Sequence, residues 1–422
     1  MVEVWLPYGK TEVCVRVPTK NLLGIIEPND RAGAQNPQAE IENALMNPFG
    51  KERLAGSVKP GEKVCIALRD YGAPTNQMVI SAILNELTAA GARDEDIMAI
   101  FAHDPLQVSS VQGETPPIGE DLSAKIGFSG QDCEAGEHVY VGKTSRGTDV
   151  YLNKGFAESD VKIVAGLVEP HPFAGYCGSQ EVVLPGISNT ETVRQNLSLG
   201  LDAKAVKGLL EGNPVHQDMV EAAQLADVDF TLNIVRNGRF QVVAALAGEL
   251  SRAFDEAVKL AEEIYRVHVE DRADVVFVSP GGHPFDANLS EASKCIDAAL
   301  GVAKRGKVIV LVAECFDGYG QRDFYEAMSR YRNPKDLEKS LKKHFTVGGL
   351  MAHRLMTSLQ KSEVVLVSAM PDYYVSGAFR MKPARTANEA FRLVSDIAGK
   401  NGQVSFVPHG NLTVPLMKAA KE

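Results

Sequence analysis

The sequence predicts an α/β fold with two domains, each a mainly parallel or mixed sheet covered by helices. The chain has 422 residues, which is more than one hydrophobic core usually serves. From about residue 60 onward, short apolar runs alternate with helical patterns, as expected of strand–helix–strand units. Apolar residues make up 45% and charged residues 23%, which is ordinary for a globular protein.

The first half of the chain contains three apolar runs that read as buried parallel strands: KVCIAL (63–68), IMAIFA (97–102) and VKIVAG (161–166). A helical pattern between residues 79 and 87 joins the first two, and Gly91 marks its end. Ligands of such sheets bind beyond the carboxyl ends of the strands. The sequence places polar groups there, namely Arg69-Asp70, His103-Asp104 and Glu169-Pro170-His171.

The second half repeats this arrangement, with predicted strands at VVFVS (275–279), VIVLVA (308–313) and VVLVS (364–368). We expect a helix between residues 290 and 304, and another that a capping box opens at Thr386. A second capping box, 188–191, precedes a helix in the first half. The helical stretch 252–265 separates the two groups of strands. It therefore predicts a boundary between a domain of residues 1–265 and one of residues 266–400.

Composition excludes several classes of function. The net charge of −10 and the absence of a basic run argue against a nucleic-acid partner. No stretch of about 18 apolar residues and no basic-then-apolar leader is present, so we expect no membrane partner and a cytoplasmic location. The six cysteines are scattered without a C-x-x-C pair, which argues against a zinc site and favours reduced thiols.

The segment from Glu169 to Gly186 is the densest in residues that could carry chemistry. Gly175, Gly178 and Gly186 permit tight turns and close approach to a ligand. His171 follows a predicted strand and titrates near neutrality, so it could act as a general acid or base. The alternative is a glycine-rich turn in which His171 is bonded to the backbone.

This segment resembles the signature of the nickel-pincer lactate racemase family, H-x-F-A-G-[FY]-S-G-G-x-K-x-x-x-P-G. Further stretches are similar to that family in the same order: 6–9, 47–48, 212–216, 281–288 and 313–320. The resemblance implies two domains with a cleft between them. It also implies that a tail, residues 401–422, packs back on the N-terminal domain, and it is compatible with a homodimer.

The resemblance further implies a racemase or epimerase that acts on a small 2-hydroxy acid with a nickel-pincer nucleotide. His103 and His171 would be the catalytic pair that takes the hydroxyl proton. The implied substrate-binding residues are Lys294, Glu291 and Tyr176, and the implied cofactor-binding residues are Asp70, Gly178, Ser179 and Glu181. We expect Cys177 to line the same interdomain cleft.

Three positions depart from the family pattern. The lysine that would link the cofactor covalently is Glu181, the histidine that would ligate nickel is Leu197, and an arginine of the D-x-T-R-P motif is Ala73. A carboxylate cannot form the covalent link and leucine has no donor atom. We therefore expect no tethered cofactor and assign no metal ligand. Cys177 is either a substitute ligand or a small buried residue.

Two other functions are compatible with these departures. The first is a metal-independent dehydratase or proton-transfer enzyme on the same scaffold, in which Glu181 and Glu291 act as acid and base beside His171. The second is a homologue without catalytic activity that binds a small acid.

Overall fold

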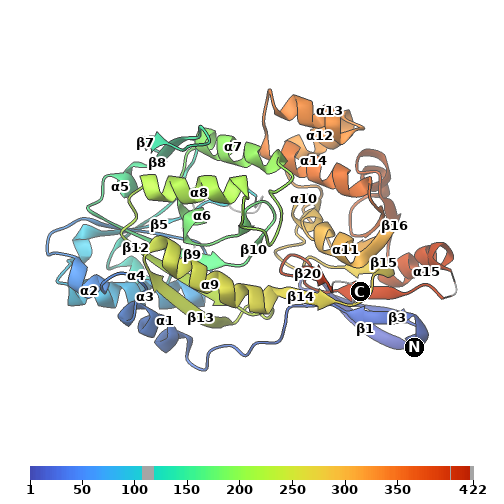
Figure 1. Cartoon of the computed structure of the whole chain (residues 1–422), viewed down its shortest axis with the longest axis horizontal. Coiled ribbons are helices and arrows are strands. Elements are labelled where there is room, and N and C mark those ends of the chain that lie inside the picture. The colour runs from blue at the N-terminus through green and yellow to red at the C-terminus, as the bar shows by residue number, and fades with distance from the viewer. Residues whose placement is uncertain (107–117, 400, 419–422) are drawn as a thin grey trace. The chain divides into compact units, whose positions relative to one another are not determined.

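The computed structural model describes residues 1–106, 118–399 and 401–418. It divides into two compact units (Figure 1). The continuous unit comprises Asp30–Ile264, and the split unit combines Met1–Asn29 with Tyr265–Glu422. The division between Ile264 and Tyr265 lies next to the predicted boundary at residue 265. No helix in the described ranges has the length and apolar character needed to cross a bilayer.

The continuous unit contains a six-stranded sheet in the order β13-β12-β9-β4-β5-β6. All neighbouring strands are parallel except β12 and β13. These strands are β4 (Val64–Leu68), β5 (Ile97–Phe101), β6 (Gly127–Gly130), β9 (Val161–Val168), β12 (Phe230–Arg236) and β13 (Val242–Gly248). Two small hairpins pair β7 (His138–Lys143) with β8 (Asp149–Asn153), and β10 (Pro170–His171) with β11 (Gly175–Tyr176).

Helices cover both faces of this sheet. Figure 1 shows α6, α7 and α8 on one side of it, and α1 and α3 on the other. The helices are α1 (Pro37–Met46), α2 (Leu54–Ser57), α3 (Ala73–Ala89), α4 (Glu120–Ser123), α5 (Lys154–Ala157), α6 (Ser179–Val183), α7 (Thr190–Ser198), α8 (Pro214–Leu225) and α9 (Leu250–Tyr265), with 3-10 turns at Asp94–Asp96 and Leu199–Leu201. The core between these layers is mainly aliphatic, and its fully buried residues include Ile66, Ile83 and Ile163.

The split unit contains a six-stranded parallel sheet in the order β18-β17-β16-β15-β19-β3. These strands are β3 (Leu22–Ile25), β15 (Ala273–Val278), β16 (Ala303–Val312), β17 (Glu363–Val367), β18 (Lys382–Ala384) and β19 (Val404–Val407). Further pairs are the hairpin of β1 (Val2–Tyr8) with β2 (Thr11–Val17), and β14 (Arg266–Val269) with β20 (Val414–Met417).

The helices of the split unit are α10 (Leu289–Ser293), α11 (Ile296–Val302), α12 (Arg322–Arg330), α13 (Pro334–Leu341), α14 (Val347–Leu359) and α15 (Ala387–Ala398), with a 3-10 turn at Thr19–Asn21 and the π-helical turn η4 at Tyr374–Ala378. As predicted, the Thr386 side chain caps α15 by accepting a hydrogen bond from the Glu389 amide. The cap of α7 is Asn189, one residue later than the pattern at 188–191 suggested.

Two expectations about these elements need correction. The helix predicted between residues 290 and 304 is two short helices, α10 and α11, that separate at Lys294-Cys295. Residues 1–29 do not belong to the N-terminal domain, because β3 pairs with β19 in the sheet of the split unit. The tail strands belong to the split unit, where β19 lies between β15 and β3 and β20 pairs with β14. Packing of the tail on the N-terminal domain stays a prediction.

Candidate active site

Arg69 organises a charged cluster at the carboxyl ends of β4 and β5. It follows β4 directly, and its Nη1 donates a hydrogen bond of 2.8 Å to Glu181 Oε2. Its Nη2 lies 3.4 Å from Asp104 Oδ2, just beyond β5. The side chains of Arg69 and Glu181 are 18% and 7% exposed, so water screens this ion pair little. One guanidinium therefore links residues from two strand ends with α6.

Close packing of α6 on β9 places Glu181. A side chain on Gly166 in β9 would meet the backbone of Gly178 and Ser179 at 2.4 Å, so only glycine lets α6 begin there. The Ser179 amide donates to Asn233 Oδ1 on β12 at 2.9 Å, which ties the start of α6 to the sheet. Glu181 then lies in the first turn of α6, where the helix dipole favours a negative charge.

Burial governs the electrostatics of this ion pair. Burial raises the pKa of Glu181 to about 7, while Arg69 acts in the opposite direction and Asp104 adds to the increase. Burial alone would lower the pKa of Arg69, but Glu181 and Asp104 more than offset this and hold it well above its ordinary value. Glu181 can therefore gain or lose a proton near neutral pH beside a permanent cation.

His171 contacts the cluster from β10. Its Nδ1 accepts hydrogen bonds from the Phe173 and Ala174 amides at 3.1 and 2.7 Å, so we assign the ring hydrogen of the neutral form to Nε2. Nε2 lies 3.8 Å from Glu181 Oε1. In this arrangement His171 presents a hydrogen-bond donor toward Glu181. His171 is thus bonded to the backbone of its turn, as one of the two sequence interpretations expected. Its other ring nitrogen, Nε2, faces the carboxylate of Glu181.

His103 lies beyond β5, where its amide donates to Gly186 O at 2.8 Å. Burial lowers the pKa of its imidazole, although Asp104 and Asp132 act against this. His103 is therefore neutral at physiological pH and able to accept a proton. Together with Arg69, Asp104 and Glu181 it lines a cavity of about 20 Å³, which has room for a water molecule.

Cys177 is a buried thiol rather than an available ligand. Its Sγ donates toward Leu167 O at 3.0 Å and lies 3.2 Å from Glu169 O. Burial raises its pKa well above the ordinary value, with Glu181 and Glu169 adding to the increase. Because metals bind the thiolate, these contacts favour the structural alternative for Cys177.

The predicted cofactor residues other than Glu181 have structural partners. Asp70 Oδ1 accepts hydrogen bonds of 2.8 Å from the Gly72 amide and from Asn76 Nδ2, and so closes the turn that leads into α3. Gly178 precedes α6 and lies against Phe254, which leaves no room for a side chain. Ser179 is fully buried and bonded to Asn233. Their role toward a cofactor stays a prediction.

The predicted substrate residues belong to different units. Glu291 lies in α10 of the split unit and Lys294 directly follows that helix. Lys294 Nζ donates a hydrogen bond of 2.7 Å to Glu291 Oε2. Their side chains are 11% and 7% exposed. Tyr176 is fully buried in β11 of the continuous unit. Their shared cleft with His103 and His171 stays a prediction.

Sequence reasoning identified the two histidines and Glu181 but did not assign roles to Arg69, Asp104, Glu169 or Arg236. Arg236 Nη2 lies 3.3 Å from Glu169 Oε2, and both side chains are mostly buried. Three of these residues, Arg69, Asp104 and Glu169, could have been recognised because they are charged and follow buried strands.

Comparison with known proteins gives this geometry its context. A model described as lactate racemase N-terminal domain matches residues 8–208, and one described as lactate racemase C-terminal domain matches residues 268–414. The chain belongs to the lactate racemase family.

Relatives of this lactate racemase homologue extend over nearly its whole length. It is 28% identical over 420 residues to a lactate racemase of Thermoanaerobacterium thermosaccharolyticum, covering 97% of this chain and 98% of that protein. It is 27% identical over 422 residues to a lactate racemase of Lactiplantibacillus plantarum, covering 97% and 99%.

Solved structures agree with this assignment. The lactate racemase apoprotein of Thermoanaerobacterium thermosaccharolyticum matches with a TM-score of 0.88 and 27% identity, covering 98% of this chain and 100% of that one. A Thermotoga maritima protein shares the fold, with a TM-score of 0.68 at 15% identity, over 92% of this chain and 100% of that one. The predicted α/β fold is confirmed, and the family consists of isomerases.

The residues present do not fit a covalently tethered nickel-pincer nucleotide. Position 181 carries a carboxylate that Arg69 already engages at 2.8 Å. Leu197 is buried in α7 and offers no donor atom. Within the described ranges, no three His, Cys, Asp or Glu side chains are grouped as metal ligands would be. The departure at position 181 thus corresponds to an ion pair with Arg69, and the departure at position 197 to a buried apolar side chain.

Proposed function

We propose that this chain is an isomerase that inverts the configuration of a small 2-hydroxy acid. One observation carries the proposal: His103 and Glu181 line the same cavity at the carboxyl ends of β4 and β5, with His171 3.8 Å from the Glu181 carboxylate. Two proton acceptors and one donor thus converge where α/β sheets bind ligands. The similarity to lactate racemases along the whole chain supports the same class of reaction.

The proposed proton roles differ between the two histidines. His103, whose pKa burial lowers, accepts the proton of the substrate hydroxyl and later returns it. The Cα–H electron pair would pass as hydride to a noncovalently bound pyridinium-type cofactor and return to either face of the planar keto acid. His171 cannot accept at Nε2 while its Nδ1 is bonded to the Phe173 and Ala174 amides, so it donates. Glu181, with a pKa of about 7, takes up or returns the proton that His171 exchanges.

Binding of the substrate carboxylate is assigned to Lys294. Its ammonium is paired with Glu291 at 2.7 Å, so a substrate would compete with Glu291 for it. Tyr176 is fully buried and would support the site without touching substrate. We propose further that the chain works without a covalent link at residue 181, because Glu181 lacks the amine that such a link requires.

The test is inversion of D- and L-lactate, and of two larger 2-hydroxy acids, by the full-length protein. It should be prepared with and without coexpressed cofactor-building enzymes, and the products resolved by chiral chromatography. We expect inversion of at least one acid, and a loss of at least about 100-fold in kcat for His103→Gln and for Glu181→Gln.

The control is His344→Gln, which removes an exposed histidine of the split unit and should leave the rate unchanged. The proposal is wrong if neither preparation inverts any of the acids. It is also wrong if His103→Gln turns over as fast as the control.

A further inference from the structure

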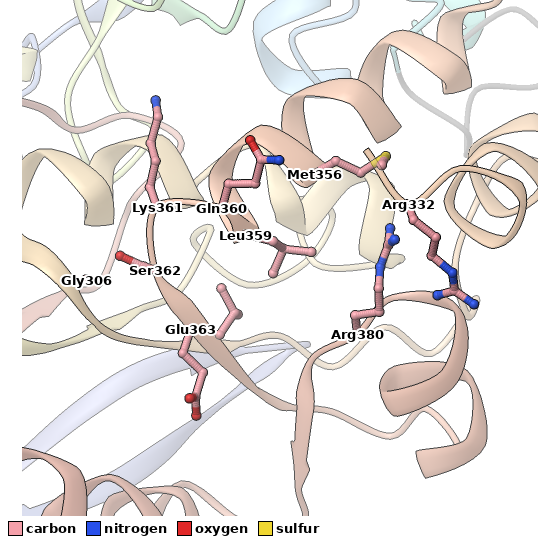
Figure 2. Close-up of a pocket in the computed structure, with 10 residues that line it drawn as sticks. Gly306, Arg332, Met356, Leu359, Gln360, Lys361, Ser362, Glu363 and Arg380 are labelled. Carbon is pink, nitrogen blue, oxygen red and sulfur yellow. The ribbon is translucent and has the colours of Figure 1, made fainter. Parts of the chain in front are cut away.

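A second cavity, of about 450 Å³, lies in the split unit at the amino end of its parallel sheet. Figure 2 shows the side chains around it, which come from the end of α14, the start of β17 and the segments before α13 and β18. Its lining comprises Gly306, Arg332, Met356, Leu359, Gln360, Lys361, Ser362, Glu363, Val364 and Arg380. Ligands of the reaction are expected at the opposite, carboxyl edge of such a sheet. This cavity is therefore distinct from the strand-end groups described above.

Two arginines stand next to each other at this cavity. Figure 2 shows the guanidinium groups of Arg332 and Arg380 side by side, with Lys361 and Glu363 directed away from them. Burial and then the charge of Arg332 lower the pKa of Arg380, so the two cations affect one another. No carboxylate contributes to the pKa of Arg380, and within the described residues neither arginine forms an ion pair. Glu363 is engaged elsewhere, by Lys382 at 2.6 Å.

The backbone holds Arg380 in an unusual conformation. Its φ is 55°, in the left-handed region that residues with a side chain rarely adopt. It follows η4, and π-helical turns occur frequently at functional sites. The Nη1 of Arg380 donates to Tyr331 O at 3.0 Å, which fixes the guanidinium at the cavity. Strained backbone positions cluster at active sites and ligand clamps, and this one holds a cation that pairs with no carboxylate among the described residues.

The remaining lining determines the class of ligand. Leu359 supplies apolar surface, while Met356 and Val364 line the cavity with only 3% and 1% of their surface exposed. Gln360, Ser362 and Lys361 are polar. Two guanidinium groups provide paired N–H donors that match the oxygen geometry of a carboxylate or a phosphate. An inorganic anion would leave the apolar surface uncovered. An organic anion with an apolar body would use both halves of the cavity.

We propose that Arg332 and Arg380 form a binding site for a small organic anion, a carboxylate or a phosphate monoester with an apolar body. The site is separate from the predicted site of isomerisation and does not depend on the proposed reaction. Its specificity comes from the two guanidinium groups and its additional affinity from the apolar surface of Leu359.

Isothermal titration calorimetry of the full-length protein tests this proposal with three probes: phenyl phosphate, phenylacetate and inorganic phosphate. We expect one of the two organic anions to bind at least tenfold more tightly than inorganic phosphate, and the preferred anion identifies the headgroup. Arg332→Ala and Arg380→Lys should each weaken that binding at least tenfold, because the first removes a charge and the second removes the paired donors. Arg332 is exposed, so its replacement should not affect folding.

The matched control is Arg322→Ala on α12 of the same unit, which changes the net charge equally. Arg322 is exposed and pairs with Glu326, and its loss should alter binding less than twofold. Absence of binding of both organic anions at 10 mM overturns the proposal. So does a loss of affinity in Arg322→Ala as large as that in Arg332→Ala, since this would indicate a nonspecific effect of charge.

Discussion

Glu181 is a carboxylate in a place that little water reaches, and its protonation should therefore be visible in the pH dependence of stability. Its pKa is about 7 in the folded chain against an ordinary value of 4.5. Between these values the native state binds more protons than the unfolded state, so the free energy of unfolding falls as pH rises. This contribution is complete below pH 4.5, decreases up to about pH 7 and is then constant.

Urea unfolding at pH 5 and pH 8 tests this for the natural chain and for Glu181→Gln. Glutamine stays neutral and its Oε1 can still accept from Arg69. Relative to the variant, the natural chain should lose stability between the two pH values. A difference between the two proteins that is the same at both pH values would show that Glu181 is ionised throughout.

At this scale the sequence indicated which residues lie at the site but not how they pair. His103, His171 and Glu181 were accessible to prediction because parallel strands end at one edge of a sheet and the family motif contains two of them. The bond from Arg69 to Glu181 joins residues 112 positions apart and depends on how α6 sits on β9. The orientation of α6 on β9 cannot be predicted from any local sequence pattern. The assignment of the His171 ring hydrogen likewise needs the geometry of the turn.

On the scale of elements, the contact of α6 with β9 should be sensitive to a single methyl group. Gly166→Ala would place Cβ 2.4 Å from backbone atoms of Gly178 and Ser179, which no side-chain rotation can relieve. We expect a loss of about 1–3 kcal/mol in the free energy of unfolding, as for other overpacked positions. A displaced α6 would also separate Glu181 from Arg69 and abolish the pH dependence described above.

Gly127→Ala is the matched control for this variant. Gly127 lies in β6 of the same sheet, and a Cβ there meets nothing within 4 Å. Alanine at a strand glycine should be neutral or should stabilise by about 0.5 kcal/mol. Equal unfolding midpoints for the two variants would mean that α6 does not depend on close approach at Gly166.

The six buried strands used in the prediction were found because fully buried parallel strands are continuous apolar runs. Val64–Leu68 and Glu363–Val367 lie within a residue of their predicted ends. The helix predicted for residues 290–304 failed because periodicity extends across the break at Lys294-Cys295, where packing of two short helices decides the structure. Short strands such as β3 and β18 have too few residues for an alternating pattern to be recognised.

At the scale of the whole molecule, the chain returns to its beginning. Strand β3 extends the sheet of the split unit through β19, and the hairpin of β1 and β2 packs on the same core. Pairing between residues near 25 and residues near 406 has no local signature. For this reason the sequence assigned residues 1–29 to the N-terminal domain, whereas they belong to the split unit.

The N-terminal hairpin contributes to the core of the split unit. Leu6 is fully buried in a core cluster with Phe277 and Phe406, whereas its neighbour Trp5 is 53% exposed. Leu6→Ala removes packed atoms from the core of the split unit and should cost about 2–5 kcal/mol. Trp5→Ala should cost less than about 1 kcal/mol, because most of that side chain already contacts water.

Hydrogen exchange measured by mass spectrometry locates the effect. In Leu6→Ala, amide protection should fall in β15, β16 and β19 and stay unchanged in β4 and β9 of the continuous unit. A loss of protection confined to β4 and β9 would contradict the assignment of residues 1–29 to the split unit.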